Sequence, residues 1–178
     1  MTDSLPADGP PADSLPAGSP PAGSPPADSP LEEDAARELA ERCMRTMLGA
    51  DAASASLGIR ALWAAPGRAE MAMTVTPAML NGHLIGHGGM VFTLADTAFA
   101  VACNSYNRTT VATGCDIDFL AQVRAGDELR ALAVERYRRG RGGLYDVTVR
   151  RAVGAVVAEM RGRCREIQGS LVGEPARS

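Results

Sequence analysis

Residues 81–105 decide the fold of this chain, and they read NGHLIGHGGM (81–90), VFTLADTAFA (91–100) and VACNS (101–105). The pair Gly88-Gly89 opens a run in which almost every position to Cys103 is apolar. A helix that is apolar nearly all round is buried, so we predict a central helix over 88–104 that other elements wrap. One acid, Asp96, lies within this run. A carboxylate is costly to bury alone, so such a residue usually has a partner or a chemical role.

The start of the predicted helix offers a second chemical feature. Glycine lets a ligand approach the backbone N–H groups closely, and these groups carry the positive end of the helix dipole. We therefore predict Gly88 as an oxyanion donor and Asp96 as a base, the combination that hydrolysis of an activated acyl group needs. Two structural alternatives stay open. In the first, Asp96 is a structural buried acid capped by Thr93 or Thr97. In the second, the two glycines only permit tight packing of the helix against a strand.

Composition divides the chain into three parts. Of its 178 residues, 1–30 hold nine of the twelve prolines in a loose repeat of PAD, PAG and SP units, with four aspartates and no basic residue. Such sequence buries too little apolar surface to offset the entropy of ordering, so we predict a disordered tail; it also fits neither a secretory signal nor a transit peptide. Residues 31–170 suffice for one domain with a single core, and 171–178 are expected to form a C-terminal tail.

Charge and cysteine content exclude several classes of protein. Outside the first thirty residues 18 arginines accompany 17 acidic side chains, and aromatic residues are few, which argues against a nucleic-acid partner. The four cysteines are far apart and form no CxxC pair, as expected of reduced thiols in a cytoplasmic protein. No apolar segment reaches the ~18 residues that span a bilayer, so no membrane partner is expected.

The segments around the central helix predict one further helix and six strands. Ser29, Pro30 and Glu32 match an N-cap, a first-turn proline and a capping box, and Gly49 is the expected end of this helix. Strands are expected over 57–64, 68–76, 110–119, 128–137, 143–151 and 155–167. No long helix separates the last four strands, so we predict an antiparallel sheet and an α+β fold.

A long helix wrapped by an antiparallel sheet is similar to the hotdog fold. The motifs resemble more specifically those of the phenylacetate-pathway (PaaI-type) acyl-CoA thioesterases, over about 58–167. They are NGHLIGHGG, FTLADTAFAVACNS, DIDFL (116–120), AGDEL (125–129) and GLYDV (143–147). Five motifs in the same order make the resemblance specific, and the proline-rich tail lies outside it.

The resemblance implies a role for each motif residue. Asp96 would be the catalytic carboxylate, as general base or nucleophile, and Gly88 would donate its N–H to the thioester carbonyl. Asn81 and His87 would line the site and orient the carbonyl or water, and Gly89 would contact the substrate. The implied reaction is hydrolysis of aryl-acetyl-CoA (phenylacetyl or hydroxyphenylacetyl) and related acyl-CoA thioesters, with no cofactor besides the CoA of the substrate.

A cluster of arginines at a strand turn has two interpretations. Arg136, Arg138, Arg139 and Arg141 follow one another closely, and most such runs form a solvated face. The alternative is that Arg139 and Arg141 bind the phosphates of coenzyme A, since the guanidinium group suits phosphate geometry.

Other chemistries fit the motifs less well. His83 and His87 have the spacing of a metal pair, but they flank loop residues and no third ligand is near, so no metal site is expected. No Gly-x-Ser-x-Gly elbow is present for a Ser-His-Asp triad. A hotdog enoyl-thioester hydratase and a non-catalytic acyl-CoA binding module remain as alternatives. The position of His87 before the helix counts against the hydratase, and the presence of Asp96 counts against the binding module.

Helix geometry predicts that two chains build each site. Gly88 and Asp96 are eight residues apart, or roughly 12 Å along a helix axis, yet both must reach one carbonyl group. We therefore predict an obligate homodimer in which two central helices run antiparallel across a two-fold axis. Each site would take Gly88, Asn81 and His87 from one chain and Asp96 from the other. The resemblance implies that dimers pair into a tetramer.

Overall fold

The structure is a computed structural model that describes residues 30–173, so the predicted tail before Pro30 and the N-cap at Ser29 lie outside the described residues. Its elements are α1 (Pro30–Ala50), α2 (Ala52–Ser56), β1 (Arg60–Ala65), β2 (Arg68–Thr74), η1 (Pro77–Met79), α3 (Gly88–Asn104), β3 (Thr110–Phe119), β4 (Glu128–Arg139), β5 (Gly142–Arg151) and β6 (Val156–Glu166). The α+β class is confirmed. Among these residues no helix combines the length and the hydropathy that crossing a bilayer requires.

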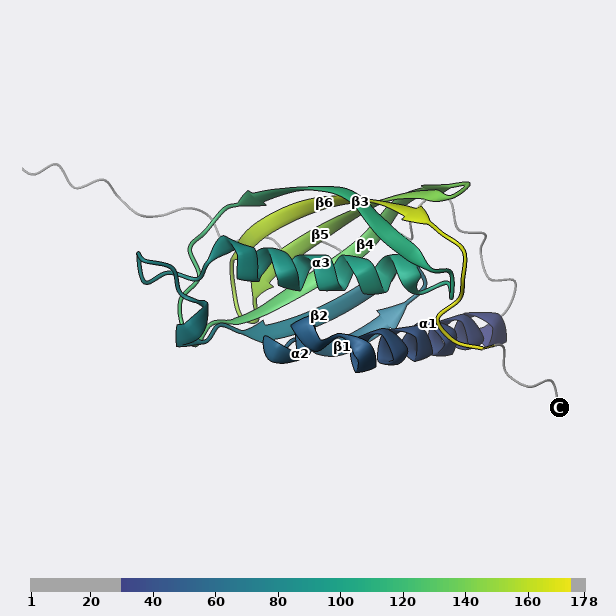
Figure 1. Ribbon diagram of the computed structural model, residues 1–178, viewed down its shortest axis with the longest axis horizontal. Helices are drawn as coiled ribbons and strands as arrows, with labels where there is room; N and C mark the ends of the chain where they lie inside the picture. Colours follow the sequence, from purple (N-terminus) through teal and green to yellow (C-terminus); the bar gives the residue numbers. More distant parts are fainter. Residues whose placement is uncertain (1–29, 174–178) are drawn as a thin grey trace, which may run out of the picture.

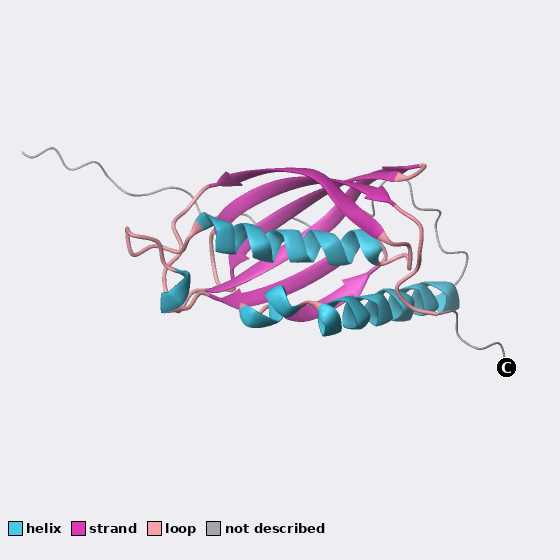
Figure 2. Ribbon diagram, in the orientation of Figure 1, coloured by secondary structure: helices cyan, strands magenta, loops and turns pink. Residues whose placement is uncertain are grey.

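The strands form one antiparallel sheet that curves around α3. Its order is β1-β2-β4-β5-β6-β3, so β1 and β3 lie at the two edges. Figure 1 shows α3 along the inner face of this sheet, with α1 beside β1 and parallel to the long axis of the molecule. Figure 2 shows that both long helices lie on the same side of the sheet. The antiparallel sheet that the sequence predicts is therefore confirmed, and it holds α3 at the centre of the domain.

The central helix and the strands after it lie where the sequence predicts them. α3 begins at Gly88 and ends at Asn104, and β3 covers 110–119 as expected. β4 and β5 extend slightly further into their shared turn than predicted, because the ladder continues to the pair Arg139 and Gly142.

The segment between α1 and β1 departs from the prediction. Asp51 caps the short helix α2, and its carboxylate accepts a hydrogen bond from the Ser54 N–H at 2.9 Å. This helix occupies the residues before β1, so the first strand starts at Arg60 rather than at residue 57. α1 continues through Gly49 to Ala50, and the expected end at Gly49 is wrong by one residue because the chain turns there directly into α2.

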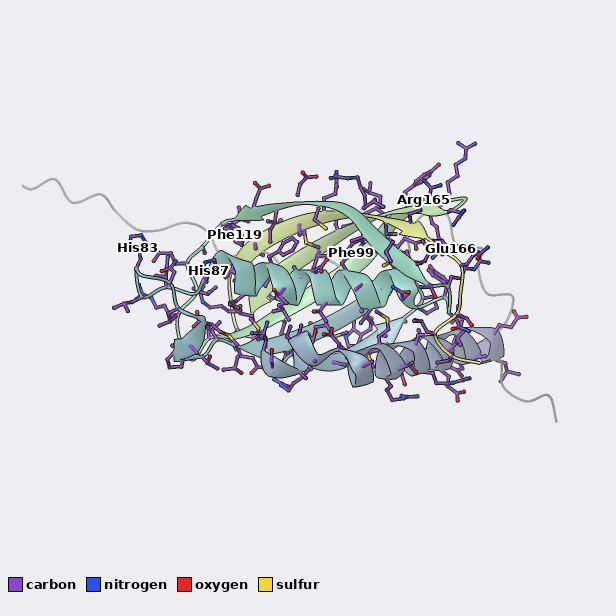
Figure 3. The ribbon with its side chains drawn as sticks, in the orientation of Figure 1. His83, His87, Phe99, Phe119, Arg165 and Glu166 are labelled. Carbon is purple, nitrogen blue, oxygen red and sulfur yellow. The ribbon has the colours of Figure 1, made fainter. Side chains whose placement is uncertain are left out.

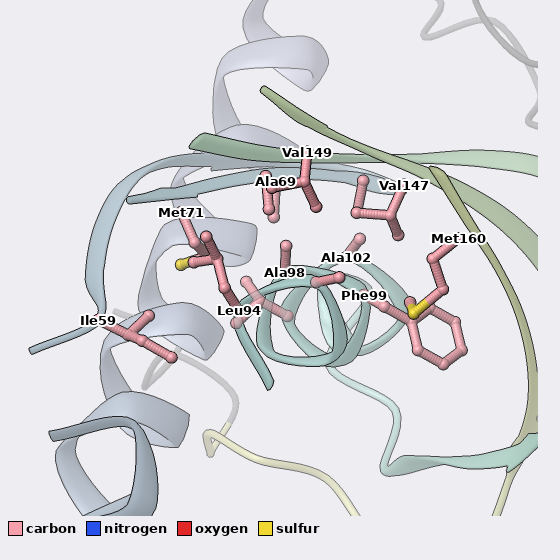
Figure 4. Close-up of a cluster of buried hydrophobic side chains, with 14 of the residues drawn as sticks. Ile59, Ala69, Met71, Leu94, Ala98, Phe99, Ala102, Val147, Val149 and Met160 are labelled. Carbon is pink, nitrogen blue, oxygen red and sulfur yellow. The ribbon is translucent and has the colours of Figure 1, made fainter. Parts of the chain in front are cut away.

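The core fills the space between α3 and the inner face of the sheet (Figure 4). Ala98 and Ala102 are fully buried on α3, and their small side chains let the helix lie close to the strands. Phe99 packs edge-to-face against Tyr145, with the ring centroids 5.5 Å apart. A Cβ at Gly162 would lie 2.8 Å from the Phe99 ring, so this close approach requires glycine.

A polar cluster lies inside this core at the far end of α3. Glu135 is only 1% exposed, and its carboxylate accepts a hydrogen bond of 2.5 Å from the Tyr145 hydroxyl. Arg138 lies 3.9 Å from the same carboxylate oxygen. Burial and the hydrogen bond to Glu135 raise the pKa of Tyr145, which keeps the hydroxyl a donor. The buried Glu135 carboxylate thus has a hydrogen-bond donor and an ion-pair partner, and without them its burial would oppose folding.

Replacing Tyr145 with phenylalanine is expected to lower the free energy of unfolding by about 1.5–3 kcal/mol. The ring contact with Phe99 is kept, but the buried Glu135 loses its short hydrogen bond. Urea denaturation followed by circular dichroism measures the effect. Tyr137→Phe, at a position that is 51% exposed, is the matched control and should unfold like the wild type. Equal stability of the two variants would contradict a structural role for the Tyr145 hydroxyl.

The end of the described chain is attached to the domain. Asn107 has a positive φ of 57°, and its Oδ1 accepts hydrogen bonds of 2.9 Å from the N–H groups of Leu171 and Val172. Arg42 of α1 donates to the Gly173 carbonyl at 3.1 Å, so residues 171–173, at the start of the segment expected to form a C-terminal tail, contact α1 and the loop after α3.

Candidate active site

The loop between η1 and α3 is a tight hairpin that holds Asn81. Its ends pair at Leu80 and Gly86, and the Asn81 Oδ1 accepts a hydrogen bond of 2.9 Å from the His83 N–H. The Gly86 N–H donates to the carbonyl of Val123 at 2.7 Å. A Cβ at Gly86 would overlap a Val123 methyl group, so no side chain fits there. These contacts hold the loop against the segment that follows β3.

His87 caps the start of α3. Its Nδ1 accepts a hydrogen bond of 3.0 Å from the Gly89 N–H, which requires that the neutral ring carries its proton on Nε2. The carbonyl of His87 accepts from the N–H groups of Met90 and Val91. Within residues 30–173 the Gly88 N–H makes no hydrogen bond, although it lies at the positive end of the helix. Gly88 is thus an open donor, whereas the N–H of Gly89, an expected substrate contact, is occupied by His87.

A cavity of about 320 Å³ opens at this helix start, and we call it the α3 cavity. Asn81 and Gly88 both line it, so the fold brings two predicted site residues together. Phe119 forms another wall, and its ring lies so close that a Cβ at Gly88 would be 3.0 Å from it. Figure 3 shows Phe119 and His87 at this end of the molecule. Sequence reasoning did not select Phe119, because only the pairing of β3 with β6 carries it over Gly88.

Asp96 lies two turns further along α3, half-buried and outside the α3 cavity. Neither neighbouring threonine caps it, because Thr93 Oγ1 donates to the Gly89 carbonyl and Thr97 Oγ1 to the Thr93 carbonyl, each at 2.9 Å. Burial raises the pKa of Asp96, and no hydrogen bond or ion pair within the described part of the chain offsets it. The alternative that Asp96 is a structural acid capped by Thr93 or Thr97 is therefore not supported. A desolvated, unpartnered carboxylate is suited to take up a proton.

One face of α3 is left uncovered. Gly89, Thr93, Asp96 and Ala100 recur at intervals of three and four residues and all remain partly or fully exposed. Figure 1 shows no labelled helix or strand drawn over the front of α3. Gly88 and Asp96 lie roughly 12 Å apart along the axis, so a single chain does not bring the donor and the carboxylate to one point.

The expected phosphate-binding arginines lie at the other end of the sheet. Arg139 ends β4 and Arg141 lies in the turn that follows it, and Gly142, the first residue of β5, pairs with Arg165. Figure 3 shows Arg165 at the opposite end of the molecule from His87. Arg141 donates from Nε to the Glu166 carbonyl at 3.0 Å. Within one chain the structure does not bring these two arginines to the α3 cavity.

The two histidines also separate. His83 lies exposed at the tip of the loop, while His87 turns back onto the helix start (Figure 3). Among residues 30–173 no group of three or more His, Cys, Asp or Glu side chains is placed to hold a metal ion.

Comparison with known proteins identifies the family. Residues 82–158 match the family model described as "Thioesterase superfamily". The chain is 45% identical over 124 residues to the acyl-coenzyme A thioesterase PaaI of Escherichia coli (strain K12). The aligned residues cover 70% of this chain and 89% of that protein.

Solved structures agree with the sequence match. The structure of the E. coli PaaI protein from the phenylacetic acid degradation operon gives a TM-score of 0.74 at 42% identity, over 75% of this chain and 97% of that one. A mutant of the phenylacetic acid degradation protein PaaI from Thermus thermophilus gives 0.63 at 35% identity, over 66% and 100%. The hotdog fold expected from the motifs is therefore confirmed, and the chain belongs to the thioesterase superfamily.

Proposed function

We propose that the protein is a cytoplasmic acyl-CoA thioesterase that hydrolyses aryl-acetyl-CoA or related acyl-CoA thioesters to the free acid and CoA. The observation that carries the proposal is the open Gly88 N–H at a cavity, together with the unpartnered carboxylate of Asp96. The 45% identity to the E. coli acyl-coenzyme A thioesterase PaaI supports the substrate class. The free state of all four cysteines suits a reducing compartment.

The proposed reaction uses only protein groups, water and substrate. Water attacks the carbonyl carbon of the thioester while Asp96 takes one of its protons. The carbonyl oxygen becomes negative, and the Gly88 N–H donates to it at the positive end of α3. The C–S bond then breaks, and the sulfur of CoA leaves with the proton that Asp96 had taken. The amide of Asn81 and the Nε2–H of His87 orient the carbonyl group or the water.

The separation of Gly88 and Asp96 along α3 supports a composite site in a dimer. If two α3 helices lie antiparallel across their uncovered faces, Gly88 of one chain approaches Asp96 of the other. Gly89 has no side chain, so it permits close contact of the two helices. β3 beside this face is an edge strand whose outer side is unpaired in one chain. Pairing of two such dimers into a tetramer is part of the proposal.

The antiparallel arrangement also gives the arginines a role. It sets the turn between β4 and β5 of one chain near the Gly88 end of the other. Gly142 beside this turn pairs with Arg165, and Arg165 lies at the opposite end of the molecule from His87. We therefore keep Arg139 and Arg141 as proposed contacts of the CoA phosphates, offered to the site of the second chain.

Release of free thiol from phenylacetyl-CoA, followed with a thiol reagent, tests the function. Enzyme without substrate is the blank, because the protein carries its own cysteines. A panel of aryl, branched and straight acyl-CoA thioesters then ranks the acyl groups. Hydration of a crotonyl thioester without thiol release would instead indicate a hydratase. Tight binding of acyl-CoA with neither reaction would indicate a binding module.

The value of kcat/KM is expected to fall at acid pH in a single titration step, with a midpoint above the ordinary aspartate pKa of 3.8. Asp96 accepts a proton only when ionised, and burial raises its pKa above the ordinary value of 3.8. Activity should therefore be full above the raised pKa and fall with slope one as the pH drops through it. The residual rate of Asp96→Asn should lack this titration step. A step at the same pH in the variant would assign the titration to another group.

A further inference from the structure

A second cavity, which we call the α1 cavity, lies between the end of α1, the start of α2 and the second half of α3. Its volume is about 380 Å³. Most of its wall is apolar, and its lining includes Met47, Leu48, Asp51, Thr97, Ala100 and Val101. Ala100 lies one turn after Asp96 on the same face of α3, so the cavity opens beside the catalytic carboxylate.

The polar side chains in this wall are already bonded to protein groups. Thr97 Oγ1 donates to the Thr93 carbonyl and lies 3.0 Å from the Ser54 hydroxyl. Both carboxylate oxygens of Asp51 accept from Ser54, one from its N–H at 2.9 Å and one from its hydroxyl at 2.5 Å. The lining side chains therefore offer a ligand apolar contacts and one carboxylate, but no free donor for an anion.

The charge of Asp51 makes the α1 cavity selective. The hydrogen bonds from Ser54 lower the pKa of Asp51, so the carboxylate is ionised at neutral pH. Apolar side chains such as Leu48 and Val101 favour an apolar group in the cavity, and the fixed negative charge repels a second carboxylate.

The two cavities match the two arms of a thioester. In the composite site the carbonyl group lies between Gly88 of one chain and Asp96 of the other. The α3 cavity of the first chain and the α1 cavity of the second therefore flank the carbonyl on different sides. The α3 cavity carries the side-chain amides of Asn81 and Gln122, which suit an arm that contains amide groups. The α1 cavity suits an acyl group without polar ends.

We propose that the α1 cavity binds the acyl group of the substrate and restricts the enzyme to uncharged acyl groups of up to about aryl size. This inference rests on the acyl-CoA thioesterase function proposed above. The pantetheine arm then lies in the α3 cavity. The residues that set the acyl preference are Leu48 and Asp51, which lie outside the five sequence motifs.

The first test removes an apolar wall. In Leu48→Ala the ratio of kcat/KM for phenylacetyl-CoA to that for acetyl-CoA is expected to fall about tenfold, because only the larger group reaches the lost side chain. Leu39→Ala is the matched control, since Leu39 is also half-buried on α1 but lies outside the cavity. Its ratio should stay within about twofold of the wild type.

The second test removes the charge and keeps the fold. Asparagine caps helices as well as aspartate does, so Asp51→Asn retains the start of α2. The ratio of kcat/KM for glutaryl-CoA to that for phenylacetyl-CoA is expected to rise at least about fivefold, as the loss of one like charge near 4 Å in water implies. This result does not depend on the folding of the Leu48 variant.

Two outcomes overturn the inference in distinguishable ways. If both ratios stay at the wild-type value while Phe119→Ala lowers the phenylacetyl-to-acetyl ratio, the acyl group lies in the α3 cavity instead. If the wild-type protein releases no thiol from any acyl-CoA, the proposed function fails and the inference fails with it. If the wild type is active and the two kcat/KM ratios change as expected in the Leu48 and Asp51 variants, the proposed function and the inference are both supported.

Discussion

Replacing Asp96 with asparagine is expected to lower the turnover of phenylacetyl-CoA by about 10²–10⁴-fold. The amide has nearly the same shape as the carboxyl group but cannot take a proton from water. Because Asp96 has no hydrogen bond or ion pair within the described residues, the change removes no contact that supports the fold. Single-turnover thiol release measures the loss. Near-normal turnover in this variant would end the assignment of Asp96 as the base.

The same variant should gain stability while it loses activity. Burial raises the pKa of Asp96 in the folded protein, so above its ordinary value of 3.8 the folded state binds more protons than the unfolded chain until the raised pKa is passed. Stability from this group is therefore present at low pH and lost as the pH rises through the raised pKa. At neutral pH the charge opposes folding, and Asp96→Asn should unfold at a higher urea concentration than the wild type.

A matched substitution on the neighbouring strand separates this effect from a general effect of charge. Asp118→Asn removes one negative charge from an exposed position of β3. It should change neither turnover nor the urea midpoint by more than a small amount. A gain of stability in both variants would point to the net charge of the protein rather than to the burial of Asp96.

The elements that could be predicted best are those whose own residues show a clear apolar pattern with breaks at both ends. α3 is apolar on almost every side, so its limits at Gly88 and Asn104 follow from the glycine pair and from the polar residues after Cys103. β3 likewise lies between clear breaks in the pattern. α2 has only five residues and begins at a cap that also fits a turn, so composition does not separate it from the start of a strand.

Only part of the geometry of the candidate site could be expected from the sequence. Asn81 and Gly88 are close in sequence, so their meeting at the α3 cavity follows from the local chain, as does the position of His87 at the cap of α3. The wall formed by Phe119 depends on the register of β3 with β6, and the α1 cavity depends on how α1 crosses α3. Neither arrangement leaves a periodic signal. Whether Asp96 had a partner was also a tertiary question, and the hydrogen bonds of Thr93 and Thr97 answer it.

Gly88→Pro is expected to abolish turnover while preserving α3. Proline removes the N–H at the first helical position, where it is well tolerated, and His87 has the extended conformation (φ −63°, ψ 129°) that suits a residue before proline. The Phe119 ring lies against Gly88, so any side chain added at this position requires the ring to move slightly. Gly88→Ala is the matched control, because it adds a Cβ beside Phe119 but keeps the N–H. Activity in Gly88→Ala and none in Gly88→Pro would attribute the loss to the missing donor.

Mixing the two inactive variants then decides whether two chains build each site. Asp96→Asn and Gly88→Pro are unfolded together and refolded, so about half of the dimers combine one chain of each kind. If Gly88 and Asp96 of different chains serve one carbonyl, each hybrid dimer has one intact site and one doubly damaged site, and about a quarter of wild-type activity should return. If each chain held a complete site, every site in the hybrid would carry one lesion and no activity would return. Native mass spectrometry confirms the hybrids, so their presence without activity would refute the composite site while leaving the thioesterase assignment to the wild-type assay.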